Sequence, residues 1–286
     1  MLAEKIDGMV VSSDGIRAEW YGDENILGDA SKIFREVELR CRAALFNDRN
    51  VVMDATNLNA KKRKNFLNQM PTGHQYKCVV MCTPFDECYA RDCKRERHVG
   101  FEVLARMVRN FQMPYYNEGW DKIELVFPPH DVELIGHDHL QEELVFDQKN
   151  HHHSMTVGEH EQAAANYASD NDFPYLVRCA ANWHDCGKIH TQSPPDSNGD
   201  CHYRGHDSVS AYYYITSYEA GWMVEIGNED AAIKIATMVT WHMVPYQFEK
   251  SDYPREEFLM WARSKDFDEE MAENIWQLHL CDVAAH

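Results

Sequence analysis

The stretch Asn-Trp-His-Asp-Cys-Gly-Lys, residues 182–188, places a histidine and an aspartate side by side, at His184 and Asp185. Imidazole and carboxylate groups are the ligands that hard and borderline divalent ions prefer, so this pair marks a candidate metal site. The other candidate ligands are His160 upstream, Asp282 downstream, and His206 and His242 between the pair and Asp282. A divalent ion held by such a set activates water, and the sequence therefore predicts a metal-dependent hydrolase.

The sequence around this stretch predicts an all-helical domain over residues 151–286. Periodic apolar patterns predict helices over residues 156–169, 173–186, 206–220, 228–243, 255–263 and 267–284. Pro194 to Gly199 is rich in turn residues and predicts a loop. The helices of a bundle can bring ligands that are far apart in the chain to one interior point, which is what the candidate ligands require.

Residues 151–286 resemble the HD domain, a superfamily of helical metal-dependent phosphohydrolases. His160 is similar to the first ligand of that family, His184 and Asp185 to its signature doublet, and Asp282 to its final ligand. The resemblance also implies catalytic roles at the doublet and at Lys188, His206 and His242, where family members steady the phosphate or hold a second metal. The metal (Mn, Mg, Ni, Co, Fe or Zn) and the number of ions stay open. The implied substrates are phosphomonoesters, nucleotides or cyclic phosphodiesters.

The first half of the chain predicts a parallel α/β sheet. Short apolar runs predict strands at residues 9–12, 50–54, 77–82 and 123–127, and helical patterns between them cover residues 30–47, 59–69 and 85–112. Ligands of such sheets bind at the carboxyl ends of the strands. We expect a first domain over residues 1–127, a linker over 128–150 and the helical domain after it, which makes the fold class α/β plus all-α.

Polar residues at the expected strand ends resemble those of P-loop kinases of the polynucleotide kinase type, which have a three-layer α/β fold. Asp14 and Arg17 are similar to the family's Asp-x-x-Arg element for the acceptor 5′ end. The segment from Met53 to Asn57 is similar to its Asp-Ala-Thr-Asn strand end, and residues 85–112 to its arginine-bearing lid helix. The substrate-binding residues that the resemblance implies are Asp14, Arg17, Asp54, Thr56, Asn57, Arg91 and Arg95.

One element of that family is absent from the sequence. Kinases of this class bind the phosphates of ATP with a GxxxxGK[ST] loop, and no such loop occurs here. We expect a kinase-like domain without its first strand and Walker A loop, explained by a truncated gene model, a fragment or a degenerate domain. ATP is then expected as a cofactor only if the phosphate loop is restored.

Composition limits the partners and the cellular compartment that we expect for the chain. The chain has 286 residues, 44% of them hydrophobic, and a formal net charge of −19, which opposes the coating of extended nucleic acid. Nine cysteines without paired CxxC spacing indicate free thiols in the cytoplasm. The sequence contains no signal-peptide pattern and no apolar run of about 18 residues, so we expect no association with a membrane. The run of three histidines at residues 151–153 predicts a solvated loop, and the sequence leaves the oligomeric state open.

These observations leave three functions. The first is a metal-dependent phosphohydrolase that acts on phosphate esters of nucleotides or nucleic-acid ends and is joined to a kinase-like remnant. The alternative is an ATP-dependent 5′-hydroxyl polynucleotide kinase whose HD domain is accessory. A third is a non-catalytic nucleotide-sensing module, which would contain no metal.

Overall fold

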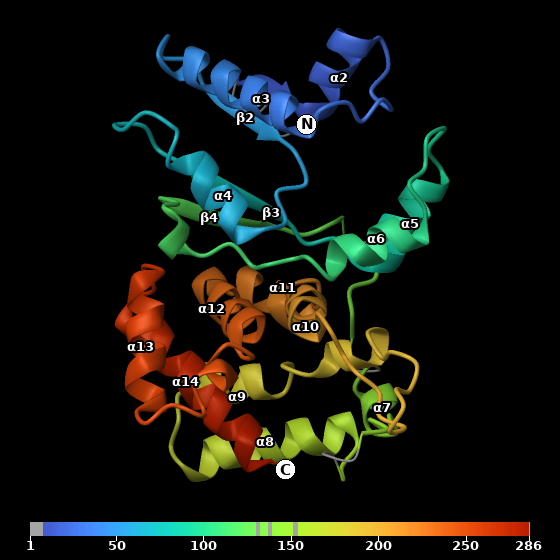
Figure 1. Ribbon diagram of the computed structural model, residues 1–286, viewed down its shortest axis with the longest axis vertical. Helices are drawn as coiled ribbons and strands as arrows, with labels where there is room; N and C mark the ends of the chain where they lie inside the picture. Colours follow the sequence, from blue (N-terminus) through green and yellow to red (C-terminus); the bar gives the residue numbers. More distant parts are fainter. Residues whose placement is uncertain (1–7, 130–131, 137–138, 151–153, 286) are drawn as a thin grey trace. The chain divides into compact units, whose positions relative to one another are not determined.

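The computed structural model describes residues 8–129, 132–136, 139–150 and 154–285, and the histidines at 151–153 lie outside these ranges. The chain divides into two compact units, Met1–Tyr76 and Lys77–His286. The first unit contains β1 (Met9–Ser12), α2 (Ser13–Tyr21), α3 (Ala30–Leu45), β2 (Val51–Asp54) and α4 (Ala60–Leu67). Figure 1 shows both units coloured along the sequence.

The core of the first unit forms between its strand pair and one face of α3. β1 and β2 are parallel, with Val11 opposite Met53 and Ser12 opposite Asp54. α3 buries Ile33, Val37 and Cys41, which recur at four-residue spacing and therefore share one helix face. These side chains pack with Val11, Ile16 and Met70. The expected strands and helices of this segment are confirmed, with boundaries that shift by one or two residues.

The second unit begins with a second parallel strand pair. Its strands are β3 (Lys77–Met81) and β4 (Lys122–Val126), connected through α5 (Phe85–Cys93), α6 (Phe101–Val108) and η1 (Tyr116–Glu118). The strand pair and its connection bond directly to the helical part, where the Leu125 backbone N–H donates to Glu229 and the Tyr212 hydroxyl donates to the Thr83 carbonyl. These contacts place β3 and β4 in the helical unit. The expected domain boundaries at residues 127 and 150, and the three-layer arrangement, stay predictions.

Helices form the rest of the second unit. They are α7 (His139–Glu143), α8 (Val157–Asp170), α9 (Tyr175–Ala181), η2 (Cys186–His190), α10 (His206–Ile215), α11 (Tyr218–Glu225), α12 (Glu229–Trp241), η3 (Pro245–Gln247), α13 (Pro254–Ser264) and α14 (Glu269–Ala284). In the described residues after 154, regular structure is helical, as expected. α8 packs on α9 and α14, and α12 packs on α9, α10 and α14 (Figure 1). α12 buries nine side chains on all its faces, which identifies it as a central helix of the bundle.

Two expected helices are divided or end early, and the segment over residues 85–112, expected as one or two helices, forms two. The first of these ends at Cys93, because the Asp92 carboxylate accepts the backbone N–H groups of Val99 and Gly100 and so turns the chain into α6. The helix expected over 173–186 ends at Ala181, before the metal-ligand pair. The helix expected over 206–220 divides at Thr216, whose hydroxyl bonds back to the Tyr212 carbonyl, and Ser217 then caps α11. In the described part of the chain, every helix is too short or too polar to span a lipid bilayer.

Candidate metal centre

Three segments far apart in the sequence carry the expected metal ligands. His160 lies in the first half of α8, where Thr156 and Glu159 form a capping box that fixes the start of the helix. His184 and Asp185 lie in the turn between α9 and η2, and Asp282 lies in the last turn of α14. All four residues are buried, with an exposed fraction of at most 5% each. Because α8, α9 and α14 pack on one another, these residues are brought to one interior point.

The ligand atoms of this group lie within hydrogen-bond range of one another. The Nε2 atom of His160 lies 3.2 Å from Nε2 of His184 and 3.0 Å from Oδ1 of Asp282. Oδ2 of Asp185 lies 3.4 Å from the same His160 atom. One atom from each of the four residues lies within 4.8 Å of the others, which is the spacing of ligands around one ion. The structure thus brings together the whole set that the sequence predicts.

The other nitrogen of each imidazole faces a backbone carbonyl. Nδ1 lies 2.9 Å from the Ala181 oxygen in His184 and 3.3 Å from the Ala285 oxygen in His160. A carbonyl only accepts hydrogen bonds, so Nδ1 carries the proton and Nε2 presents a lone pair to the centre. Two lone pairs 3.2 Å apart repel each other unless a proton or a metal ion lies between them. The donor set and its orientation therefore fit a divalent metal ion.

A second group of ligand atoms adjoins the first through Asp185. Its Oδ1 atom lies 3.1 Å from Nε2 of His206 and 3.9 Å from Nε2 of His242, and the two imidazoles lie 3.2 Å from each other. Their Nδ1 atoms face the carbonyls of Tyr203 and Val239, at 2.8 and 2.7 Å. Asp185 thus contributes one oxygen to each group, as a carboxylate that bridges two ions does. His206 and His242 have the geometry of ligands.

The electrostatics of the centre favour a cation. Burial raises the pKa of Asp185, but the charges of Lys188 and His184 outweigh it and hold the pKa well below the usual range. Burial likewise opposes the ionisation of Asp282, yet the charge of His184 and the contacts of the carboxylate with His160 and His184 hold its pKa well below the usual range. Both carboxylates are therefore ionised at neutral pH and present negative charge to the interior of the centre.

The histidines respond differently to the same surroundings. Burial lowers the pKa of His184, but the charges of Asp185 and Asp282 overcome that effect and raise it to about 9, so a metal ion would bind there in competition with a proton. Burial and the charges of His206 and His184 lower the pKa of His242 to about 3. His242 is thus a neutral imidazole at physiological pH, which is the form that binds a metal.

Lys188 points into the centre. Its Nζ lies 2.6 Å from Oδ2 of Asp185 and donates to Oε1 of Gln148 at 2.9 Å. The side chain is buried, with 6% of the residue exposed. Lys188 lies on η2, one turn after the metal-ligand pair, so the short helix sets its direction. It neutralises part of the carboxylate charge in the centre.

Sequence reasoning missed two residues that hold the ligands in place. The buried Glu161 accepts the backbone N–H of Asp185 at Oε1, at 2.9 Å. The Tyr246 hydroxyl donates to Oδ2 of Asp282 at 2.8 Å. Glu161 directly follows a predicted ligand and is buried in a helix, which was the available signal. Tyr246 lies on η3, far from Asp282 in sequence, and gave none.

The residues that the kinase resemblance implies are distributed over both units. In the first unit, Arg17 donates to Asp14 at 2.6 Å on α2, directly after β1. Asp54 ends β2 and is exposed, Thr56 is exposed, and the half-buried Asn57 accepts a bond from the Arg63 side chain at its carbonyl. The register that pairs Ser12 with Asp54 brings these two strand ends to one edge of the sheet.

The two lid arginines lie in the second unit and do not share a helix. Arg91 lies on α5 and pairs with Glu87 at 2.5 Å, one turn earlier on an exposed face. The expectation that Arg95 lies on the same helix is wrong, because α5 ends at Cys93 and Arg95 follows it in a loop.

The comparisons with known proteins concern the N-terminal part of the chain. Residues 1–114 match a family model described as an AAA domain, which supports a nucleotide-binding, P-loop kinase-like fold there. No curated protein matches the sequence. The match covers the first unit and continues into the second as far as the segment after α6. Residues 1–114 are thus similar to the AAA domain family.

Proposed function

We propose that the chain is a metal-dependent phosphohydrolase of the HD type. One observation carries the proposal: the Nε2 lone pairs of His160 and His184 converge with the carboxylates of Asp185 and Asp282 on one buried point. The backbone carbonyls that face Nδ1 fix this orientation, so it does not depend on a bound ion. A buried site with several imidazoles and ionised carboxylates suits a catalytic metal better than a structural one, because thiolates predominate in structural sites.

Different residues of the centre would have different roles in the hydrolysis of a phosphate ester. A divalent ion bound at the centre would lower the pKa of a water molecule and polarise a phosphoryl oxygen. His160, His184, Asp185 and Asp282 would hold this ion, and Asp185 would also face a second ion held with His206 and His242. Lys188 would be drawn from Asp185 towards the phosphate and offset its charge, because its ammonium group lies at the edge of the same centre.

We infer that the substrate is a phosphate ester of a nucleotide or of a nucleic-acid end. The support is the match of residues 1–114 to the AAA domain family, which joins a nucleotide-binding type of fold to the metal centre in one chain. Domain pairing of this kind is an analogy, and it names a substrate class without a specific compound.

Phosphate release from a panel of nucleotides and 5′- and 3′-phosphorylated oligonucleotides tests this function. The panel is assayed with Mn²⁺, Mg²⁺, Ni²⁺ or Co²⁺ on the wild type, on a His184→Ala, Asp185→Ala double variant, and on His98→Ala. His98 is an exposed histidine outside the centre and serves as the matched control. We expect turnover in the wild type and the control, and none in the double variant. Unchanged turnover in the double variant would contradict the proposal.

A second candidate function is an ATP-dependent 5′-hydroxyl polynucleotide kinase with Mg²⁺, and the family match favours it. Asp14 would accept the proton of the attacking hydroxyl, and Arg17, which pairs with it, would bind the acceptor phosphate. Transfer of the γ-phosphate of ATP to a 5′-hydroxyl oligonucleotide tests this function. Asp14→Asn should abolish the transfer, and Asp48→Asn, at an exposed turn position that suits asparagine, should not. Absence of transfer by the wild type would exclude this function for the chain.

A further inference from the structure

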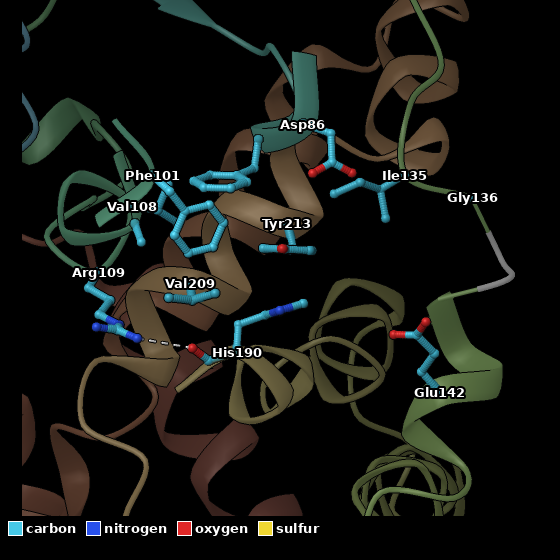
Figure 2. Close-up of a pocket in the computed structure, with 12 residues that line it drawn as sticks. Asp86, Phe101, Val108, Arg109, Ile135, Gly136, Glu142, His190, Val209 and Tyr213 are labelled. Atoms are coloured by element: carbon cyan, nitrogen blue, oxygen red, sulfur yellow. Dashed lines mark hydrogen bonds between the residues drawn. The ribbon is translucent and has the colours of Figure 1, made fainter. Parts of the chain in front are cut away.

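A cavity of about 620 Å³ lies in the second unit, apart from the metal centre. Its walls come from α5 and α6 on one side and from η2 and α10 on the other, and none of the candidate metal ligands lines it (Figure 2). The volume falls within the range of small-molecule sites, which are mostly apolar and carry a few placed polar groups. The proposed hydrolase activity assigns no role to this cavity.

Aromatic rings form the middle of the cavity. His190 of η2 and Tyr213 of α10 stack with their ring centroids 4.5 Å apart and an interplanar angle of 20°. Phe101 of α6 faces the cavity, and its ring meets Phe85 edge to face at 5.2 Å. Phe101 is 51% exposed although it is a large apolar side chain, so its ring is available to a ligand. Flat, accessible rings of this kind bind planar heteroaromatic groups by stacking.

The positively and negatively charged groups of the cavity lie on different sides of it. Figure 2 shows the guanidinium group of Arg109 on one side of the rings and the carboxylates of Asp86 and Glu142 on the other. Burial is the largest cause of the raised pKa of Tyr213, and the charges of these two carboxylates contribute to it, so both act on the space around its ring. Arg109 donates one bond to the His190 carbonyl at 3.2 Å, and its fork of five N–H groups keeps further donors for an anion.

We propose that this cavity binds a nucleoside monophosphate whose base carries an exocyclic amino group. The base stacks on the exposed ring of Phe101. Its amino group donates to one carboxylate, that of Asp86 or of Glu142, either of which accepts a hydrogen bond from an amino edge and repels a carbonyl edge. The phosphate contacts Arg109. The parts of this ligand match the cavity in order: the phosphate meets the cation, the planar base meets the aromatic rings, and the amino edge meets the carboxylates.

This site is physically linked to the metal centre. His190 lies on the same five-residue helix as Lys188, and Val209, which also lines the cavity, follows His206 by one turn of α10. Gly187 packs so closely on α10 that a Cβ atom there would lie 2.4 Å from the His206 carbonyl. A ligand in the cavity therefore contacts the two elements that carry residues of the centre, without contacting its ligands.

Calorimetric titration of the full chain with AMP and with IMP, in EDTA, tests the proposal. The two nucleotides differ in the amino group, which IMP replaces with a carbonyl, and EDTA removes any contribution of the metal centre. We expect AMP to bind at least roughly tenfold more tightly than IMP, because carboxylates discriminate strongly between a donor and an acceptor. Absence of AMP binding, or equal binding of AMP and IMP, would overturn the proposal.

Paired variants locate the site. Phe101→Ala should weaken AMP binding roughly tenfold through the loss of one stacking face, whereas Phe46→Ala, at another exposed phenylalanine, should not. Arg109→Gln should weaken the binding of AMP but not that of adenosine. Arg106→Gln, in the last turn of α6 and outside the cavity, should leave both unchanged. AMP binding that is lost in His184→Ala and retained in Phe101→Ala would overturn the proposal, because the nucleotide would then occupy the metal centre. The phosphohydrolase assay stays independent of these outcomes.

Discussion

The Nε2 atoms of His160 and His184 lie 3.2 Å apart, although 23 residues separate the two histidines and different helical segments carry them. Each imidazole is held from behind by a backbone carbonyl, so the two lone pairs face the same point. This relationship is unfavourable for two neutral imidazoles unless a proton or a metal ion lies between them, and it is the basis for the predictions that concern the centre.

Tyr246→Phe should weaken metal binding without unfolding the protein. The phenol donates to Oδ2 of Asp282 and so orients a carboxylate whose other oxygen faces the histidines. Loss of such an outer contact weakens metal affinity by about 10- to 100-fold. Competition with a fluorescent chelator measures the change, and Tyr253→Phe, at a tyrosine that is 67% exposed, is the control. Equal affinities in the two variants would show that Tyr246 does not orient Asp282.

Glu161→Ala should destabilise the fold, whereas Glu161→Gln should have a much smaller effect. Oε1 of Glu161 accepts the buried N–H of Asp185, and glutamine retains an oxygen there while alanine leaves the N–H without its acceptor. An unsatisfied buried donor costs about 1–3 kcal/mol of unfolding free energy. Urea denaturation of both variants measures the difference, and an alanine variant as stable as the wild type would contradict this role.

Gly187→Ala should destabilise the second unit through a steric clash. A Cβ atom at this position would lie 2.4 Å from the His206 carbonyl and 2.7 Å from the Ser210 backbone nitrogen, and both are backbone atoms that cannot rotate away. The expected loss is about 1–3 kcal/mol, as for other overpacked sites. Gly136→Ala is the control, because a Cβ atom there has no neighbour within 4 Å. Thermal unfolding that is identical in the two variants would refute the close packing of η2 on α10.

Glu143 should make stability depend on pH near neutrality. Burial raises the pKa of this carboxyl from the ordinary 4.5 to about 7. Because the folded value lies above the unfolded one, the protonated group stabilises the fold fully below pH 4.5, and this stabilisation is lost as pH rises through about 7. Glu143→Gln should therefore become more stable relative to the wild type between pH 5 and pH 8.

Urea midpoints in EDTA across this pH range test the prediction for Glu143. Glu133→Gln is the control, since Glu133 is an exposed glutamate outside this helix and should leave the pH dependence unchanged. If the difference in urea midpoint between the wild type and Glu143→Gln stays constant from pH 5 to pH 8, the pKa of Glu143 is not raised.

The sequence predicted the ligands of the centre more completely than the residues around them. His160, His184, Asp185 and Asp282 belong to residue types whose chemistry is specific, so their identity and spacing were informative on their own. Glu161, Gln148 and Tyr246 act only through partners that the packing of helices brings near, and no local pattern records such a contact. Gln148, which accepts from Lys188, lay in a segment expected to be a linker.

The fold was predicted best where one periodicity extends over a whole element. β1 and α3 follow from an apolar run and from four-residue spacing, and the structure confirms both. The breaks at Cys93 and Thr216 arise from side chains that bond to the backbone, at Asp92 and Thr216, and hydrophobic periodicity does not detect these bonds. The pairing of β3 with β4 inside the helical unit depends on tertiary contacts such as the bond from Leu125 to Glu229.

Metal content tests the central claim most directly. Wild type, His184→Ala and His98→Ala are each equilibrated with Mn²⁺, passed through a desalting column and assayed by elemental analysis. The convergence of His160, His184, Asp185 and Asp282 predicts at least one bound ion per chain in the wild type and in His98→Ala, and a clear loss in His184→Ala. A wild type without bound metal, or a His184→Ala variant that retains as much metal as the wild type, would contradict it.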